Sequence, residues 1–97
     1  MESLSTLDAE VSDITAIDRG YFNFSSYGLN DAIARAAATW SEGYYWGNFV
    51  ISGSSMEIMA HRYSWGLSGF ALPYGSGTAY RFYCGTASGS TPSVVAI

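Results

Sequence analysis

Hydrophobic residues near the N-terminus recur with a helical period. Leu4, Leu7, Val11 and Ile14 are spaced three, four and three residues apart, which is the a/d spacing of a heptad repeat. A stripe of this kind is not buried by a single helix, so it favours the association of several copies. Valine at an a position with isoleucine at a d position favours more than two strands. The pattern predicts a coiled-coil stalk stub over residues 1–18 and a homotrimer.

A second interpretation of the same stripe stays open. Two heptads are fewer than a coiled-coil assignment normally requires, so this segment is also compatible with an amphipathic helix packed on its own domain. The polar positions favour the stalk, because five acidic residues precede the first basic residue and suit a solvent-exposed surface: Glu2, Asp8, Glu10, Asp13 and Asp18.

Residues 19–97 change pattern and predict a separate head domain. Residues 21–25 alternate as a short strand does. Asn30 is a good N-cap, and apolar residues then recur at helical spacing as far as Gly43, a natural residue for the end of a helix. We therefore expect one small helix over about residues 31–41.

From residue 44 onward the pattern is that of β-strands. Aromatic and β-branched runs over residues 44–52, 56–63, 67–74 and 78–84 are separated by short segments rich in glycine and serine, and residues 94–97 form a last apolar run. Strands at this spacing are typical of consecutive hairpins. The chain is thus predicted to be an α+β protein with an antiparallel meander of about five to six strands.

Both faces of the predicted sheet are apolar. In the first run, Tyr45 and Phe49 lie on one face, while Tyr44 and Trp46 lie on the other. Such a sheet has to be covered twice. The helix can cover one face, which leaves the second face for a neighbouring subunit or a ligand.

Composition and charge exclude several function classes. The net charge is −4 and the four basic residues are all arginines, so the chain lacks the clustered basic surface that nucleic-acid binding requires. No apolar run approaches the ~20 residues of a membrane span, so we expect no membrane insertion. Cys84 is the single cysteine, and we expect it to be a small buried hydrophobic residue.

Catalytic and metal-binding groups are sparse. His61 is the single histidine, and Glu57 lies about 13 Å from it along an extended strand, which is too far for a dyad. One histidine per chain makes a metal site only on a symmetry axis, so we expect no metal and no cofactor. An enzyme that uses Glu42 and Glu57 as acid and base across subunits stays open as a minor alternative, but the expectation is a protein without enzymatic activity.

Aromatic residues are 16% of the chain and charged residues are 12%, and the aromatic set exceeds what a small core needs. Exposed tyrosine and tryptophan suit protein interfaces and sugar-binding surfaces, although packing of these rings between subunits is an equally weighted alternative. Trp65 and Tyr74 adjoin loops and are the first candidates for ligand contact, followed by Tyr44, Trp46 and Tyr83.

The order of these elements resembles the C-terminal tip of a bacteriophage tail fibre, and it is similar to the knob domains of phage-derived bacteriocin fibres. Residues 29–33, residues 43–47 and the strand at residues 80–83 carry the likeness. The resemblance implies a homotrimer at the tip of a virion tail fibre, made in the host cytoplasm. It also implies recognition of a bacterial surface polysaccharide or outer surface protein. The alternative is a structural trimerisation cap that ends a fibre without binding a ligand itself.

Overall fold

The computed structural model describes residues 17–51, 54–87 and 89–97 of the chain. They form one helix and one mixed sheet, in the order β1 (Ile17–Phe24), α2 (Leu29–Thr39), β2 (Gly43–Ile51), β3 (Ser54–Arg62), β4 (Gly66–Pro73), β5 (Tyr80–Gly85) and β6 (Ser93–Ala96). The predicted α+β class is confirmed. The heptad residues Leu4, Leu7, Val11 and Ile14 lie outside the described residues.

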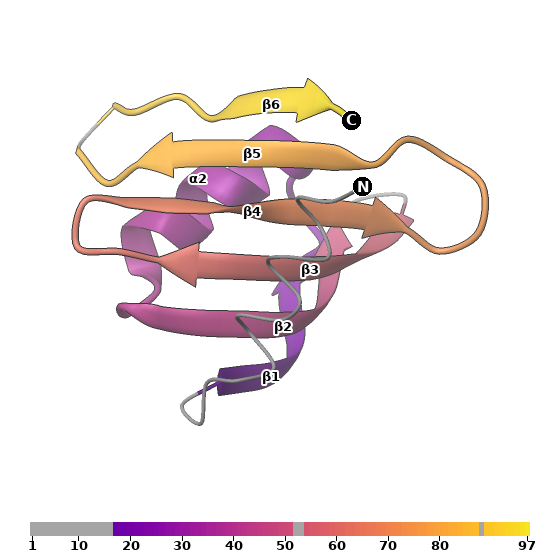
Figure 1. Ribbon diagram of the computed structural model, residues 1–97, viewed down its shortest axis with the longest axis horizontal. Coiled ribbons are helices and arrows are strands. Elements are labelled where there is room, and N and C mark those ends of the chain that lie inside the picture. Colours follow the sequence, from indigo (N-terminus) through magenta and orange to yellow (C-terminus); the bar gives the residue numbers. More distant parts are fainter. Residues whose placement is uncertain (1–16, 52–53, 88) are drawn as a thin grey trace.

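The six strands lie side by side in sequence order, and Figure 1 shows α2 on one side of the sheet. Strands β2 to β6 pair antiparallel, so the predicted meander is confirmed over this part. The prediction is wrong for β1, which pairs parallel to β2, with Phe22 opposite Phe49. A parallel pair needs a crossover between its strands, and α2 supplies it by returning the chain to the end of the sheet where β1 began.

Helix α2 begins and ends two residues earlier than the sequence predicts. The expected N-cap Asn30 lies inside the first turn, and the N-cap position is Gly28, which makes no side-chain capping bond. At the other end, the Trp40 amide donates to the Ala36 carbonyl, and Gly43 already belongs to β2. The helix contacts β4 and β5.

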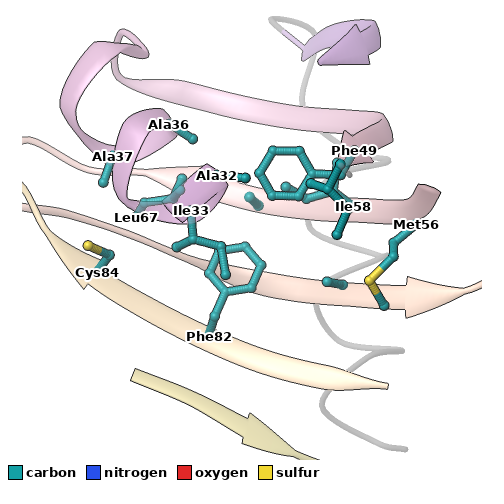
Figure 2. Packing of buried hydrophobic residues seen from close by; sticks show 13 residues of the cluster. Ala32, Ile33, Ala36, Ala37, Phe49, Met56, Ile58, Leu67, Phe82 and Cys84 are labelled. Carbon is teal, nitrogen blue, oxygen red and sulfur yellow. The ribbon is translucent and has the colours of Figure 1, made fainter. Parts of the chain in front are cut away.

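The core lies between α2 and the sheet (Figure 2). The buried side chains of the helix are small apart from Ile33, which allows its axis to approach the sheet closely, and the strands supply most of the larger side chains. The largest fully buried side chains are Phe49, Ile33, Ile58, Leu67 and Cys84. Cys84 is therefore buried, as the sequence predicted.

Strand alternation places a second set of side chains on the face of the sheet opposite α2. We call it the helix-free face because α2, the one helix among residues 17–51, 54–87 and 89–97, lies on the other side. On the helix-free face, Met59 and Phe70 are buried and pack with Trp46 and Leu72. No helix within the described part of the chain has the length and apolar character of a membrane span.

Candidate functional site

A continuous row of aromatic rings crosses one end of the helix-free face. The register of β2 and β3 pairs Tyr44 with His61, and their rings stack at 4.0 Å between centroids with 17° between planes. His61 in turn lies 3.7 Å from Tyr63, two residues further along. Tyr63 stacks on Trp65 at 4.8 Å, and Trp65 lies 6.2 Å from Tyr83 of β5. We call Tyr44, His61, Tyr63, Trp65 and Tyr83 the aromatic row.

A tight hairpin turn presents Trp65. The Tyr63 amide donates to the Gly66 carbonyl at 2.7 Å, which leaves Ser64 and Trp65 as the exposed tip between β3 and β4. Trp65 keeps 60% of its surface exposed. Its position therefore depends on the turn and on the ring of Tyr63 rather than on burial in the core.

Tyr83 reaches the row because Gly66 has no side chain. A Cβ atom at Gly66 would lie 2.7 Å from Cε1 of Tyr83 and 2.8 Å from its hydroxyl oxygen. The phenol ring thus lies against the backbone of β4 at this glycine. Because Gly66 leaves this space open, the Tyr83 ring of β5 lies beside Trp65.

A surface cleft of about 410 Å³ runs beside the row. Four rings of the row line it together with the polar residues Glu42, Arg62 and Ser64. Arg62 is oriented toward the helix, where its Nε donates to the Ala37 carbonyl at 2.9 Å and its guanidinium also donates to the Tyr63 carbonyl. A cationic side chain at the last turn of a helix is favourable, so Arg62 joins α2 to the strand that carries the row.

The structure brings together three of the five predicted ligand contacts. Tyr44, Trp65 and Tyr83 belong to the aromatic row, whereas Trp46 lies on the same face in the cluster with Met59 and donates from Nε1 to a carboxylate oxygen of Glu57 at 3.0 Å.

Tyr74 lies at the other end of β4 from Trp65. It is 57% exposed, and the eight residues of β4 separate the two rings by roughly 30 Å of extended chain. Tyr74 cannot share a small ligand with the row.

Sequence reasoning missed His61 and Tyr63 as members of the site. The sequence points to His61 only as a catalytic or metal-binding residue. The signal that could have found them is their alternation with Trp65, since residues 61, 63 and 65 share one face of an extended chain.

The carboxylates considered for acid-base catalysis are far apart within one chain. Glu57 pairs with Asn48, six residues beyond Glu42 along β2, which corresponds to about 20 Å. Paired carboxylates in glycoside hydrolases lie within about 10 Å. The two residues therefore do not form a catalytic pair in one subunit.

Burial raises the pKa of the Cys84 thiol above its ordinary value of 9.0, so the side chain is a protonated thiol near neutral pH. Among residues 17–51, 54–87 and 89–97, no three His, Cys, Asp or Glu side chains are grouped closely enough to hold a metal ion.

Comparison with protein-family models, with curated proteins and with solved structures finds no match to this chain. The function proposed below is therefore inferred from the geometry of the described residues.

Proposed function

We propose that the chain is a non-enzymatic binding head that recognises a bacterial surface saccharide or protein through its helix-free face. In this proposal it forms the host-recognition tip of a phage tail fibre, at the extracellular end of the virion. The observation that carries the proposal is the aromatic row, in which ring contacts run from Tyr44 on β2 to Tyr83 on β5.

Rings in this arrangement suit the apolar faces of sugar rings. Tyrosine and tryptophan supply flat contact area together with a polar group, and they lose little side-chain entropy when a ligand binds. Here each ring already contacts a neighbouring ring, which lowers the entropic cost of binding further. The polar groups of Glu42 and Ser64 beside the rings are able to hydrogen-bond sugar hydroxyls.

Trimerisation would strengthen binding by this surface. The heptad Leu4, Leu7, Val11 and Ile14 supports a parallel bundle that presents three heads from one stalk. Three modest sites that engage one polymer gain avidity without new contacts.

A second candidate function is a structural cap that trimerises and ends a fibre without binding a ligand. The C-terminal end supports it, because Val95 of the edge strand β6 and Ile97, which follows this strand, expose 54% and 53% of their surfaces in the single chain. Apolar groups on an unpaired strand edge suit contacts between subunits.

Two single substitutions test the binding head. Trp65→Ala removes an exposed ring of the row, and Tyr74→Ala removes an equally exposed ring at the other end of β4 and serves as the matched control. We expect Trp65→Ala to weaken binding to host cells or to an array of bacterial glycans by about tenfold or more, as for an aromatic hot spot, while Tyr74→Ala binds like the parent.

Two results would contradict the proposal. The first is unchanged binding by the Trp65→Ala protein. The second is a correctly assembled parent protein that binds no bacterial surface and no glycan, which would favour the structural cap.

A further inference from the structure

A groove on the helix-free face, next to the aromatic row, combines one cation with hydroxyl groups and apolar side chains. It has a volume of about 340 Å³ and is lined by Ser68, Phe70, Arg81, Tyr83, Ser93 and Val95. The strand register explains this composition, because β4, β5 and β6 each contribute two side chains that face the same way.

The six side chains form two parallel lines across the strands. Arg81 is opposite Phe70 on one side and Val95 on the other, so it has an apolar neighbour on each adjacent strand. Two residues along, Tyr83 is opposite Ser68 and Ser93, so a serine lies on each side of the tyrosine. The two lines are about 7 Å apart along the strands.

Arg81 differs from the other arginines whose side chains the structure describes. Arg35 stacks over the ring of Tyr27 at 4.0 Å, and Arg62 donates to two backbone carbonyls. Arg81 makes no hydrogen bond and no ion pair with the described residues, and its side chain is exposed. Its five donors are therefore available on that surface to an external acceptor.

We propose that this groove binds the carboxylate of an acidic sugar residue, such as a uronic or sialic acid, within a bacterial surface polysaccharide. The guanidinium would donate two parallel hydrogen bonds to the carboxylate, and the adjacent apolar groups would shield that pair from water. Ser68 and Ser93 lie two residues further along their strands, about 7 Å away, and their hydroxyls would hydrogen-bond the far edge of the same sugar ring. Because Tyr83 belongs both to the groove and to the aromatic row, this inference deepens the proposed function and depends on it for the polymer context.

The net negative charge of the protein disfavours binding of acidic polymers in general. A chain of net charge −4 repels polyanions at long range, so a carboxylate is retained only where a specific cation meets it. A single arginine between apolar groups provides one such contact, and it lacks the clustered charge that a nucleic-acid backbone needs. Selectivity for acidic sugars then comes from one side chain and can be removed with it.

The test is a titration of the full chain with acidic sugars, in which the backbone amide chemical shifts in the NMR spectrum report binding. The probes are galacturonate, glucuronate and N-acetylneuraminate, each compared with its methyl ester, which keeps the sugar and removes the charge. We expect at least one acid to shift the amides of residues 68, 81, 83 and 93 in a saturable way, with its ester binding about tenfold more weakly or worse. Inorganic phosphate and sulfate, tested alone, are expected to bind more weakly than that acid because they lack the ring.

Two variants assign the effect to the groove. Arg81→Gln is expected to abolish the preference for the acid over its ester, and Arg81→Lys, which keeps the charge but loses the planar fork, to retain part of it. Arg35→Gln removes the same charge from the exposed surface of α2 and is expected to keep the full preference. Since Arg81 is exposed, we expect its variants to stay folded, which the amide spectrum itself reports.

The proposal is overturned if none of the three acids binds, if acid and ester bind equally, or if Arg35→Gln removes the preference as Arg81→Gln does. Stronger binding of phosphate or sulfate than of every acid would replace the sugar by a simple anion site. Each of these outcomes is distinct from failure of the proposed function. A head that binds neutral glycans through Trp65 but shows no preference for carboxylates would retain the proposed function and contradict only this inference.

Discussion

The indole of Trp65 lies parallel to the phenol ring of Tyr63, with 6° between their planes and 4.8 Å between their centroids. Both rings project from one side of a tight hairpin, and Tyr63 is itself held by the ring of His61 at 3.7 Å. The exposed tryptophan therefore rests on an ordered neighbour rather than standing alone in solvent.

This stacking predicts the effect of Tyr63→Ala. Loss of the phenol ring removes an aromatic pair and leaves Trp65 without its support, so we expect a loss of about 0.5–1.5 kcal/mol in the free energy of unfolding and a weaker affinity for ligand. Urea unfolding measures the stability, and binding to host cells or to an array of bacterial glycans measures the affinity. A variant with the parent's stability and with unchanged ligand affinity would show that the stack has no role.

Gly66 and Gly69 lie on the same strand but predict different outcomes on substitution by alanine. At Gly66 the added Cβ meets the Tyr83 ring, which is 42% exposed and able to rotate away. At Gly69 it would lie 2.2 Å from the Met59 carbonyl oxygen, which is backbone and cannot move independently. We expect Gly69→Ala to lower the free energy of unfolding by about 1–3 kcal/mol and Gly66→Ala to lower it by less.

Gly66→Ala is instead expected to displace Tyr83 from the aromatic row. Side-chain shifts of Tyr83 in the NMR spectrum report the displacement, and the affinity for ligand reports its consequence. Equal destabilisation by both alanines would contradict this distinction between a side-chain contact and a backbone contact.

The packing of α2 on the sheet predicts a graded series at Ile33, which is fully buried between the helix and the sheet. Ile33→Val removes one methylene and is expected to cost about 0.5–1.5 kcal/mol, and Ile33→Ala about 2–5 kcal/mol because a cavity remains. Val95→Ala, at a residue that is 54% exposed, is the matched control and is expected to cost less than about 0.5 kcal/mol. Chemical denaturation measures all three variants, and an equal cost at residues 33 and 95 would contradict the assigned core.

The spacing of apolar residues along the chain predicts most of the strands and which of their side chains are buried. In the last predicted hairpin, alternation separates Phe82 from Tyr83, and the structure buries Phe82 and exposes Tyr83. The parallel pairing of β1 was missed because strand direction depends on where the intervening helix returns the chain, and residue periodicity in the strand does not report that path.

The candidate site shows the same division between local and non-local information. Exposure of Trp65 in a turn follows from the sequence, but its neighbours depend on cross-strand register, which pairs Tyr44 with His61. Tyr74 was grouped with Trp65 because both adjoin loops. The two residues lie at opposite ends of β4. Their separation follows from the length of this strand, which requires both of its ends to be known.

Burial of Cys84 predicts a loss of stability at alkaline pH. Its pKa is raised above 9.0 in the folded protein, so above pH 9 the unfolded chain releases the thiol proton while the folded chain keeps it. The contribution of the thiol is thus fully present below pH 9 and declines as the pH rises toward the folded pKa, by at most about 1.4 kcal/mol per pH unit. Denaturation of the parent and of Cys84→Ala between pH 7 and about 11 isolates the contribution of the thiol, because the two proteins differ only at residue 84.

The two proteins should lose stability with different slopes above pH 9, the parent falling more steeply. Parallel curves would show that the thiol titrates alike in the folded and unfolded states, which would contradict its burial. Alkylation rates at neutral pH give an independent check, since a buried protonated thiol reacts slowly.

The heptad at Leu4, Leu7, Val11 and Ile14 predicts a stable trimer, which light scattering across a dilution series measures directly. We expect a mass three times that of the 10.4 kDa chain. Leu7→Glu places a charge in the stripe and is expected to dissociate the trimer, whereas Thr6→Glu places the same charge on the adjacent position outside it and leaves the mass unchanged. A monomer at every concentration would instead favour the alternative in which this segment packs on its own domain, and it would remove avidity from the proposed mode of binding. Because the Trp65→Ala and Arg81→Gln tests measure single sites, their outcomes would stand in either case.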